Sequence, residues 1–334
     1  MMRAEFAEFH DELRSVASDL LAKDGHAPEW RVLADAGWTG LEVPDTLGGA
    51  GASFAESAVI LDQIGRAAGV TGYLGGAVLA TGVLNLLRPS DSRDHLLAAV
   101  AGGEPRLAVV TGDFSMSAGK LTGRAEFVPD AVGADRLLVV TGPEVAVVET
   151  AAATVTAQPV VDETRRLATV AADSATVVDI LTFDGNPADA VNALRHRAEI
   201  AVACDSLGVA EQMLSDTVDY VKVRHQFGRP IGSFQAVKHA CADMLVAVEV
   251  SRQLVADAVD VLAGGGDAAI PAAMAKSYVC AAAVEVAGKA MQLHGGIGYT
   301  WESGIHTYLK RATLNRSLFG SPAAQRRRLS QRYH

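Results

Sequence analysis

A polar, glycine-containing loop separates two long segments of helical periodicity in the last third of this 334-residue chain. The loop is Arg-His-Gln-Phe-Gly-Arg-Pro-Ile-Gly-Ser-Phe-Gln over residues 224–235, and apolar residues recur at three- and four-residue spacing on both sides of it. A third helical segment begins near Pro271 and is stopped by Gly295-Gly296, and a fourth follows. Four helices joined by short connections predict a helical bundle over residues 187–334.

The rest of the chain divides into a helical part and a β-rich part. Residues 1–103 are predicted to be helical around a loop at residues 44–51, and Ser53 followed by Glu56 predicts a capping box at the start of the next helix. Residues 104–186 are predicted to form a small β domain, because short β-branched runs occur at residues 107–110, 137–140 and 145–148. The expected fold class is therefore α+β and mostly α, with a helical domain on each side of a small β domain.

Composition excludes several classes of function. The formal charge of −10 gives no electrostatic reason to bind nucleic acid, and the basic run at residues 326–328 is interpreted as a solvated tail. The uncharged stretch 67–87 contains five glycines, which favours a buried, closely packed helix over a membrane span. The N-terminus lacks a signal peptide, so we expect a cytoplasmic protein. The three cysteines of the chain are expected to be reduced thiols, and the histidines of the chain do not have the spacing of metal ligands.

Two motifs resemble the C-terminal helical domain of the acyl-CoA dehydrogenase family. They are the loop at residues 224–235 and the later turn Gln-Leu-His-Gly-Gly-Ile-Gly-Tyr-Thr at residues 292–300. The proline- and glycine-rich loop at residues 44–51 and the helix after it also look like the N-terminal domain of that family. The resemblance implies an FAD-dependent α,β-dehydrogenation of an acyl-CoA thioester, with an electron-transfer flavoprotein as the usual electron acceptor.

The same resemblance assigns residues to the ADP half of an FAD that is bound largely to a neighbouring subunit. The planar guanidinium of arginine can bind a pyrophosphate, and the ring of phenylalanine can stack on adenine. Glutamine side chains provide neutral hydrogen-bond donors, and a Gly-Gly turn lets backbone N–H groups approach an anion closely. The residues expected to contact the cofactor are Arg224, Gln226, Phe227, Gln235, Gln292, Gly295 and Gly296. For either motif alone, the alternative is a capped helix hairpin with exposed polar side chains.

The sequence departs from the family where the flavin ring and the catalytic base are expected. Typical members carry Thr-Glu-Pro…Gly-Ser-Asp and a tryptophan in the β domain, whereas this chain has Val-Val-Thr-Gly-Asp-Phe-Ser-Met-Ser at residues 109–117 and no tryptophan there. Phe319 occupies the usual position of the catalytic glutamate. In members with a relocated glutamate, the matching position here is Ala198. Glu199 is one residue away, about 100° around a helix, so it is either a displaced base or a solvated acid near a helix start.

These departures lead to three hypotheses. The first is the short, half-site subunit of a two-gene heterotetramer of the α2β2 type known in actinobacteria. A longer partner would then supply the flavin-holding strands and the glutamate, and the substrate would be an acyl-CoA such as a steroid acyl-CoA. The second is a homo-oligomeric acyl-CoA dehydrogenase with a shifted base, Glu199 or another carboxylate. The third is a non-catalytic relative that only binds an acyl-CoA or scaffolds a partner.

Overall fold

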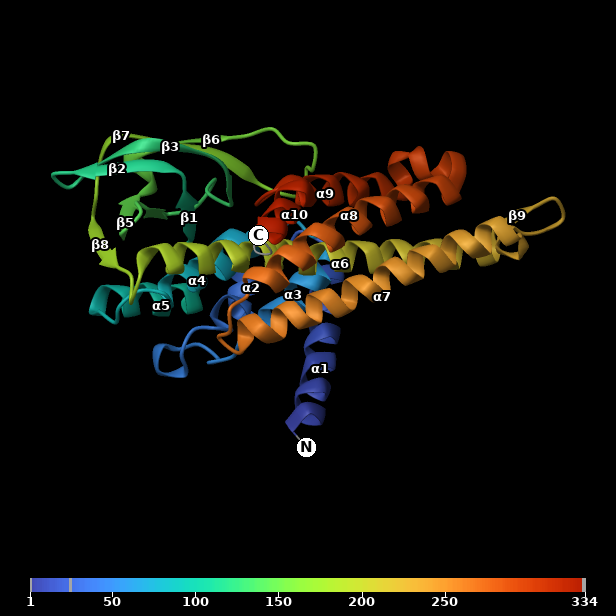
Figure 1. Ribbon diagram of the computed structural model, residues 1–334, viewed down its shortest axis with the longest axis horizontal. Coiled ribbons are helices and arrows are strands. Elements are labelled where there is room, and N and C mark those ends of the chain that lie inside the picture. Colours follow the sequence, from blue (N-terminus) through green and yellow to red (C-terminus); the bar gives the residue numbers. More distant parts are fainter. Residues whose placement is uncertain (1, 24–25, 332–334) are drawn as a thin grey trace.

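The computed structural model describes residues 2–23 and 26–331 and shows the predicted α+β architecture. Helical segments precede and follow a small β domain along the chain, and the β domain lies at one end of the molecule (Figure 1). The helices before the β domain are α1 (Met2–Lys23), α2 (Trp30–Asp35), α3 (Phe54–Arg66), α4 (Ala80–Leu84) and α5 (Asp91–Gly102). The predicted capping box is present: the Ser53 side chain accepts from the Ala55 N–H, and the Ser53 N–H donates to Glu56 at 2.8 Å.

The uncharged stretch of the N-terminal part is buried inside the molecule, as predicted. A π-helical turn, Leu74–Leu79, continues directly into α4, and every residue of both elements is buried. A side chain at Gly75 would come within 2.7 Å of the Pro129 carbonyl oxygen. The small residues in this stretch therefore serve a close contact between the π turn and the β domain.

The β domain consists of two four-stranded sheets. The strands are β1 (Leu107–Thr111), β2 (Asp113–Ser117), β3 (Lys120–Pro129), β4 (Arg136–Val140), β5 (Glu144–Glu149), β6 (Thr154–Ala157), β7 (Leu167–Thr176) and β8 (Asp179–Thr182). One sheet has the order β1-β4-β5-β8 and the other β2-β3-β7-β6. The three predicted β-branched runs form β1, β4 and β5, which are consecutive in the first sheet, with β1 parallel to β4 and β4 antiparallel to β5.

The C-terminal bundle contains α6 (Pro187–Val223), α7 (Gln235–Ala263), α8 (Ala269–His294), α9 (Ile305–Ser317) and α10 (Pro322–Gln331). The last helix corrects the sequence interpretation in part, because residues 326–328 belong to α10; Arg326 and Arg327 are exposed as predicted, whereas Arg328 is half-buried. The Arg328 guanidinium donates to the buried Glu199 at 2.5 Å. The segment Ala269–Tyr299 is apolar and long enough to cross a membrane by length and composition, but 56% of its most apolar window is buried in the molecule, as in a core helix.

A buried charge cluster lies in the core of the molecule and is centred on Asp205 of α6. Arg311 of α9 donates from Nη2 to Asp205 Oδ2 at 2.6 Å, and an Arg165 nitrogen lies 3.0 Å from Asp205 Oδ1. Asn315 donates to the same oxygen at 2.6 Å. Burial alone raises the pKa of Asp205, but Arg165 and Arg311 outweigh it and lower that pKa to about 2.

Arg311 extends this cluster to the other two parts of the chain. Its Nη1 donates to the Gly69 carbonyl in the N-terminal part at 3.0 Å and to Thr164 Oγ1 in the β domain at 2.6 Å. The side chain is 1% exposed. All five of the N–H groups of arginine lie in one rigid plane, so this single residue fixes three chain segments in one geometry.

We predict that Asp205→Asn lowers the free energy of unfolding at neutral pH by roughly 3–5 kcal/mol, because Arg165 and Arg311 would stay buried without their counter-charge. The folded-state pKa of about 2 lies below the ordinary aspartate value, so the stabilisation is present above about pH 4 and is lost as the pH falls toward 2. Denaturant unfolding of wild type and variant should show that the difference between their free energies of unfolding becomes smaller as the pH falls from about 4 toward 2. Asp173→Asn, a change of an exposed aspartate in β7, should have little effect at any pH.

Candidate functional site

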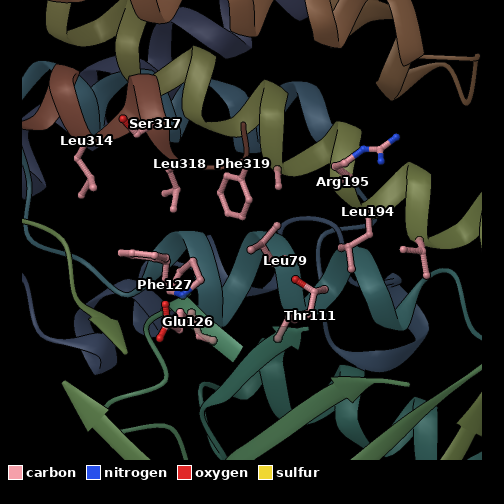
Figure 2. Close-up of a pocket in the computed structure, with 15 residues that line it drawn as sticks. Leu79, Thr111, Glu126, Phe127, Leu194, Arg195, Leu314, Ser317, Leu318 and Phe319 are labelled. Atoms are coloured by element: carbon pink, nitrogen blue, oxygen red, sulfur yellow. The ribbon is translucent and has the colours of Figure 1, made fainter. Parts of the chain in front are cut away.

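An apolar cavity of about 470 Å³ lies between the β domain and the first turns of α6. Its walls come from β1, β3, the end of the π turn, the N-terminal part of α6 and the end of α9 (Figure 2). Two residues line this cavity at the positions where the family resemblance predicts the catalytic base. They are Phe319 and Ala198. The structure therefore brings together the two alternative base positions, and neither side chain can accept a proton.

Phe319 lies on a tight turn after the end of α9. Its φ of 57° is left-handed, which is uncommon for a bulky residue. Gln325 Nε2 donates to the Phe319 carbonyl at 3.2 Å. The fully buried Lys276 donates from Nζ to the Gly320 carbonyl at 2.9 Å and to the Asn315 carbonyl at 2.9 Å. The cation thus occupies the C-terminal end of α9, where unpaired carbonyls concentrate negative charge, and holds the turn against the cavity.

Glu199 faces away from this cavity. The prediction that it could be a solvated acid near a helix start is wrong, because the side chain is buried. It is fully buried within α6. Its Oε1 accepts from Gln325 at 3.0 Å and from Arg328 at 2.5 Å, both on α10, and Arg195 lies 3.8 Å away. The carboxylate therefore anchors α10 to α6. Its pairing partners could not be predicted because they lie about 130 residues further along the chain.

Two charged residues at the cavity were not identified from the sequence. Glu126 of β3 and Arg195 of α6 both line it, and both side chains are about half exposed. Glu126 lies 3.2 Å from Arg124. No sequence motif surrounds either residue, and their convergence depends on how β3 and α6 pack.

The loop expected to contact FAD forms a small, exposed hairpin after α6. Strand β9 (His225–Gln226) pairs with β10 (Arg229–Pro230), and the turn between them has φ of 52° at Phe227 and 77° at Gly228. Two left-handed residues are characteristic of a type I′ hairpin turn. Phe227 is 91% exposed. Arg224 and Gln226 are exposed as well.

The second motif lies at the same end of the bundle as the hairpin. Tyr220, one turn before Arg224, stacks on His294 with ring centroids 4.3 Å apart and donates to the His294 carbonyl at 3.3 Å. His294 directly precedes Gly295, which has a φ of 60° and open space where a side chain would be. Gln235, Gln292, Gly295 and Gly296 are all exposed. The structure thus places both motifs at one end, with their donors accessible.

This end of the bundle is far from the cavity. Ala198 and Arg224 are separated by the length of α6, and 26 residues of α-helix span about 39 Å. Figure 1 shows the β domain at one end of the long axis and the β9 hairpin at the other. The exposed motif and the chain's own cavity therefore lie toward opposite ends of α6.

Comparisons with known proteins agree with the family indicated by the motifs. Residues 1–104 match the description "Acyl-CoA dehydrogenase, N-terminal domain", and residues 190–334 match "Acyl-CoA dehydrogenase, C-terminal domain". The chain is 33% identical to acyl-CoA dehydrogenase IpdE2 of Mycolicibacterium smegmatis, over 98% of this chain and 94% of that protein. It is 35% identical to acyl-CoA dehydrogenase FadE34 of Mycobacterium tuberculosis, over 87% of this chain and 40% of that protein.

Solved structures show the same fold. The Tcur3481-Tcur3483 steroid ACAD aligns with a TM-score of 0.85 and 26% identity over 97% of both chains. An acyl-CoA dehydrogenase from Geobacillus kaustophilus aligns with a TM-score of 0.88 and 20% identity over 98% of both. This chain belongs to the acyl-CoA dehydrogenase family, so it is an oxidoreductase of the class that acts on acyl-CoA, and its cofactor is FAD.

We predict that Arg224→Ala lowers the FAD content of the purified assembly, because a charge-assisted contact to phosphate commonly contributes roughly 1.5–3 kcal/mol. Phe227→Ala should weaken FAD binding less, since it removes a stacking contact that contributes about 0.5–1.5 kcal/mol. Both side chains are exposed, so thermal unfolding of the chain should not change. Flavin absorbance per mole of protein measures the effect, with Arg31→Ala on α2 as the control. An unchanged flavin content in Arg224→Ala would show that the hairpin is not part of an FAD site.

Proposed function

We propose that this chain is the short subunit of a heteromeric acyl-CoA dehydrogenase and completes the FAD site of a longer, related partner. The observation that carries this proposal is the position of Phe319, a residue that cannot accept a proton, at the wall of the chain's own cavity. In this assembly the exposed hairpin and the Gly295-Gly296 turn contact the ADP half of an FAD whose ring is held by the partner's strands. The partner also supplies the glutamate.

The reaction removes two hydrogens from neighbouring carbons of an acyl thioester. A base would take the proton from the α-carbon, where the carbonyl makes it weakly acidic, and FAD, when bound, would supply the hydride acceptor for the β-carbon. An electron-transfer flavoprotein would be the final electron acceptor. This chain's contribution would be to bind and orient the cofactor: Arg224 would hold the pyrophosphate, Phe227 would stack on the adenine, and the glutamines would donate neutral hydrogen bonds.

The relatives support a two-chain enzyme and suggest its substrate. One solved structure with this fold is described as the Tcur3481-Tcur3483 steroid ACAD, a description that joins two protein names. Its sequence is 26% identical to this chain. Another structure with the same fold is a complex of two named proteins, ChsE4-ChsE5. A relative at 27% identity is a subunit of a caffeyl-CoA reductase-Etf complex. We therefore propose an α2β2 assembly, a steroid acyl-CoA as substrate, and an electron-transfer flavoprotein as the electron acceptor.

The chain expressed by itself should be colourless or insoluble, whereas co-expression with its partner should yield a yellow complex of both chains. The reason is that the residues for the ADP half are exposed at one end of α6, while the cavity at the other end has an apolar wall in place of a base. Visible absorbance and size-exclusion chromatography test this. Stoichiometric flavin on the purified single chain would overturn the half-site proposal.

A second candidate function is a self-sufficient dehydrogenase with a relocated base. The observation that favours it is Glu126, an exposed carboxylate at the wall of the cavity. Glu199 is a poorer candidate for the same role, since it is fully buried and paired with Arg328 on the side of α6 that faces α10.

Glu126→Gln and Glu199→Gln in the assembled enzyme separate the two functions. If the partner supplies the base, both variants should keep turnover within a few-fold of wild type, while Glu199→Gln lowers the midpoint of thermal unfolding. If Glu126 is the base, Glu126→Gln should lower kcat by roughly 10²–10⁴-fold with FAD still bound. Steady-state turnover of an acyl-CoA and flavin content are measured together, so that a loss of cofactor is not mistaken for a loss of the base.

A further inference from the structure

A second cleft lies between the N-terminal part and the β domain. None of the described residues that line it also lines the apolar cavity or belongs to the predicted FAD contacts. The cleft has a volume of about 950 Å³. Its walls are the start of α2 and the residues before it, the segment before the π turn, the segment before β1, the connection from β3 to β4, and the residue before β7. Charged side chains line this cleft, in contrast to the apolar cavity.

Arg106 places its guanidinium inside this cleft. Its Cζ lies over the ring of Trp30, 5.6 Å from the ring centroid, and Trp30 Nε1 donates to the Gly103 carbonyl at 2.7 Å. A Cβ at Gly133 would lie 3.4 Å from Arg106 Nη1, and a Cβ at Gly72 would lie 3.7 Å from Nη2. Trp30, Gly72 and Gly133 all line the cleft. The guanidinium therefore lies among the walls, and the two glycines leave space beside both Nη atoms.

A second arginine of the same cleft, Arg166, is exposed and lies directly before β7. Neither guanidinium forms a hydrogen bond or an ion pair with any residue in the described ranges 2–23 and 26–331. The main chain of both residues is fixed, because the Arg106 N–H donates to Asp135 Oδ2 at 2.7 Å and the Arg166 carbonyl accepts from the Asp130 N–H at 2.9 Å. Two planar forks of N–H donors are thus held on rigid backbone without a counter-charge bonded to them.

The two positive charges act on the same buried carboxylate. Asp130 is 7% exposed and accepts from the Gly75 N–H at 2.8 Å. Burial raises the pKa of Asp130 to about 6, and this hydrogen bond, Arg165, Arg106 and Arg166 act in the opposite direction. Charges influence a carboxylate in this way only from nearby. Arg106 and Arg166 therefore converge on one side of the cleft.

Three exposed carboxylates also line the cleft, and they restrict the kind of anion that fits. Glu29, Glu104 and Asp135 form no ion pair with Arg106 or Arg166 in the part of the chain that the structure describes. Carboxylates repel an anion but accept hydrogen bonds from hydroxyl groups. A phosphate monoester of a polyol satisfies both kinds of wall. Its phosphate carries about −1.5 to −2 charges at pH 7, which matches two guanidiniums better than the single charge of a carboxylate does.

We propose that this cleft is a binding site for a sugar phosphate, with the phosphate on Arg106 and Arg166 and the sugar hydroxyls donating to Glu29 and Glu104. A volume of about 950 Å³ exceeds what a phosphate group alone requires and lies within the range of small-molecule sites. Because the walls belong to both the N-terminal part and the β domain, the bound ligand stabilises the contact between these two parts. The site is independent of the proposed function.

The test compares ribose 5-phosphate with ribose, which share the sugar and differ in the phosphate. Isothermal titration calorimetry of the purified assembly should show binding of ribose 5-phosphate and no measurable binding of ribose. Arg106→Gln and Arg166→Gln should each weaken ribose 5-phosphate roughly tenfold, as for the loss of a charge-assisted contact to phosphate. Arg88→Gln removes an exposed arginine outside the cleft and should leave the affinity unchanged. Absence of binding to wild type would overturn the proposal.

Two further variants separate a lost contact from a folding defect. Arg106→Gln also removes the contact with Trp30, so its thermal unfolding is measured beside that of wild type. Arg106→Lys keeps the charge without the planar fork and should bind ribose 5-phosphate with an affinity between those of wild type and Arg106→Gln. Arg166→Gln changes an exposed side chain and leaves the Trp30 contact intact. An unchanged affinity in Arg166→Gln contradicts the two-arginine site even if Arg106→Gln has an effect.

Inorganic phosphate and succinate test the assigned chemistry of the ligand. Inorganic phosphate lacks the sugar, and succinate carries two negative charges without a phosphate, so both should bind more weakly than ribose 5-phosphate. Equal affinity for succinate would make the cleft a general dianion site, and equal affinity for inorganic phosphate would leave the carboxylates without a role; either result overturns the proposal. Ribose 5-phosphate contains neither adenine nor pyrophosphate, so these results are separate from the flavin content that tests the proposed function.

Discussion

The ion pair between Asp205 and Arg311 is the contact on which the relative placement of the three parts depends. Arg311 reaches the N-terminal part through Gly69 and the β domain through Thr164, while Asp205 belongs to the long helix α6. Both walls of the apolar cavity are thereby fixed, because one wall is α6 and α9 and the other is β1 and β3. A charge cluster of this kind defines a single geometry, since any shift leaves buried charges unpaired.

The sequence predicts the features that arise from local chemistry. The Ser53–Glu56 capping box and the runs that form β1, β4 and β5 depend on residues a few positions apart, and the structure confirms them. The helix α10 and the pairing of Arg328 with Glu199 were not predicted. Those contacts join residues 129 positions apart, and a triplet of arginines at a chain end has no local pattern that distinguishes a packed helix from a solvated one.

The residues of the candidate site also fall into a group that the sequence predicts and a group that it does not. Phe319 and Ala198 were located by the spacing of motifs along the chain, and the structure shows that both line one cavity. Glu126, Phe127 and Arg195 were missed. Their proximity arises from a register shift between β3 and β7 and from the direction in which α6 passes the β domain, and neither is encoded in a short stretch of sequence. A left-handed phenylalanine has no sequence signature, because the residue type itself argues against that conformation.

The length of α6 explains why one chain can be half of a site. The helix has 37 residues, and the part between Ala198 at the cavity and Arg224 at the hairpin spans about 39 Å, so a rigid rod of this length separates the two ends. The end that we propose to contact the cofactor requires only exposed donors on a fixed hairpin, and it can be retained whether or not the cavity keeps a base or a flavin ring. Substitutions at Phe319 and Phe127 therefore act on one end without disturbing Arg224 and Phe227 at the other. A duplicated chain of this family can lose its own catalysis and still complete the cofactor site of an unlike partner.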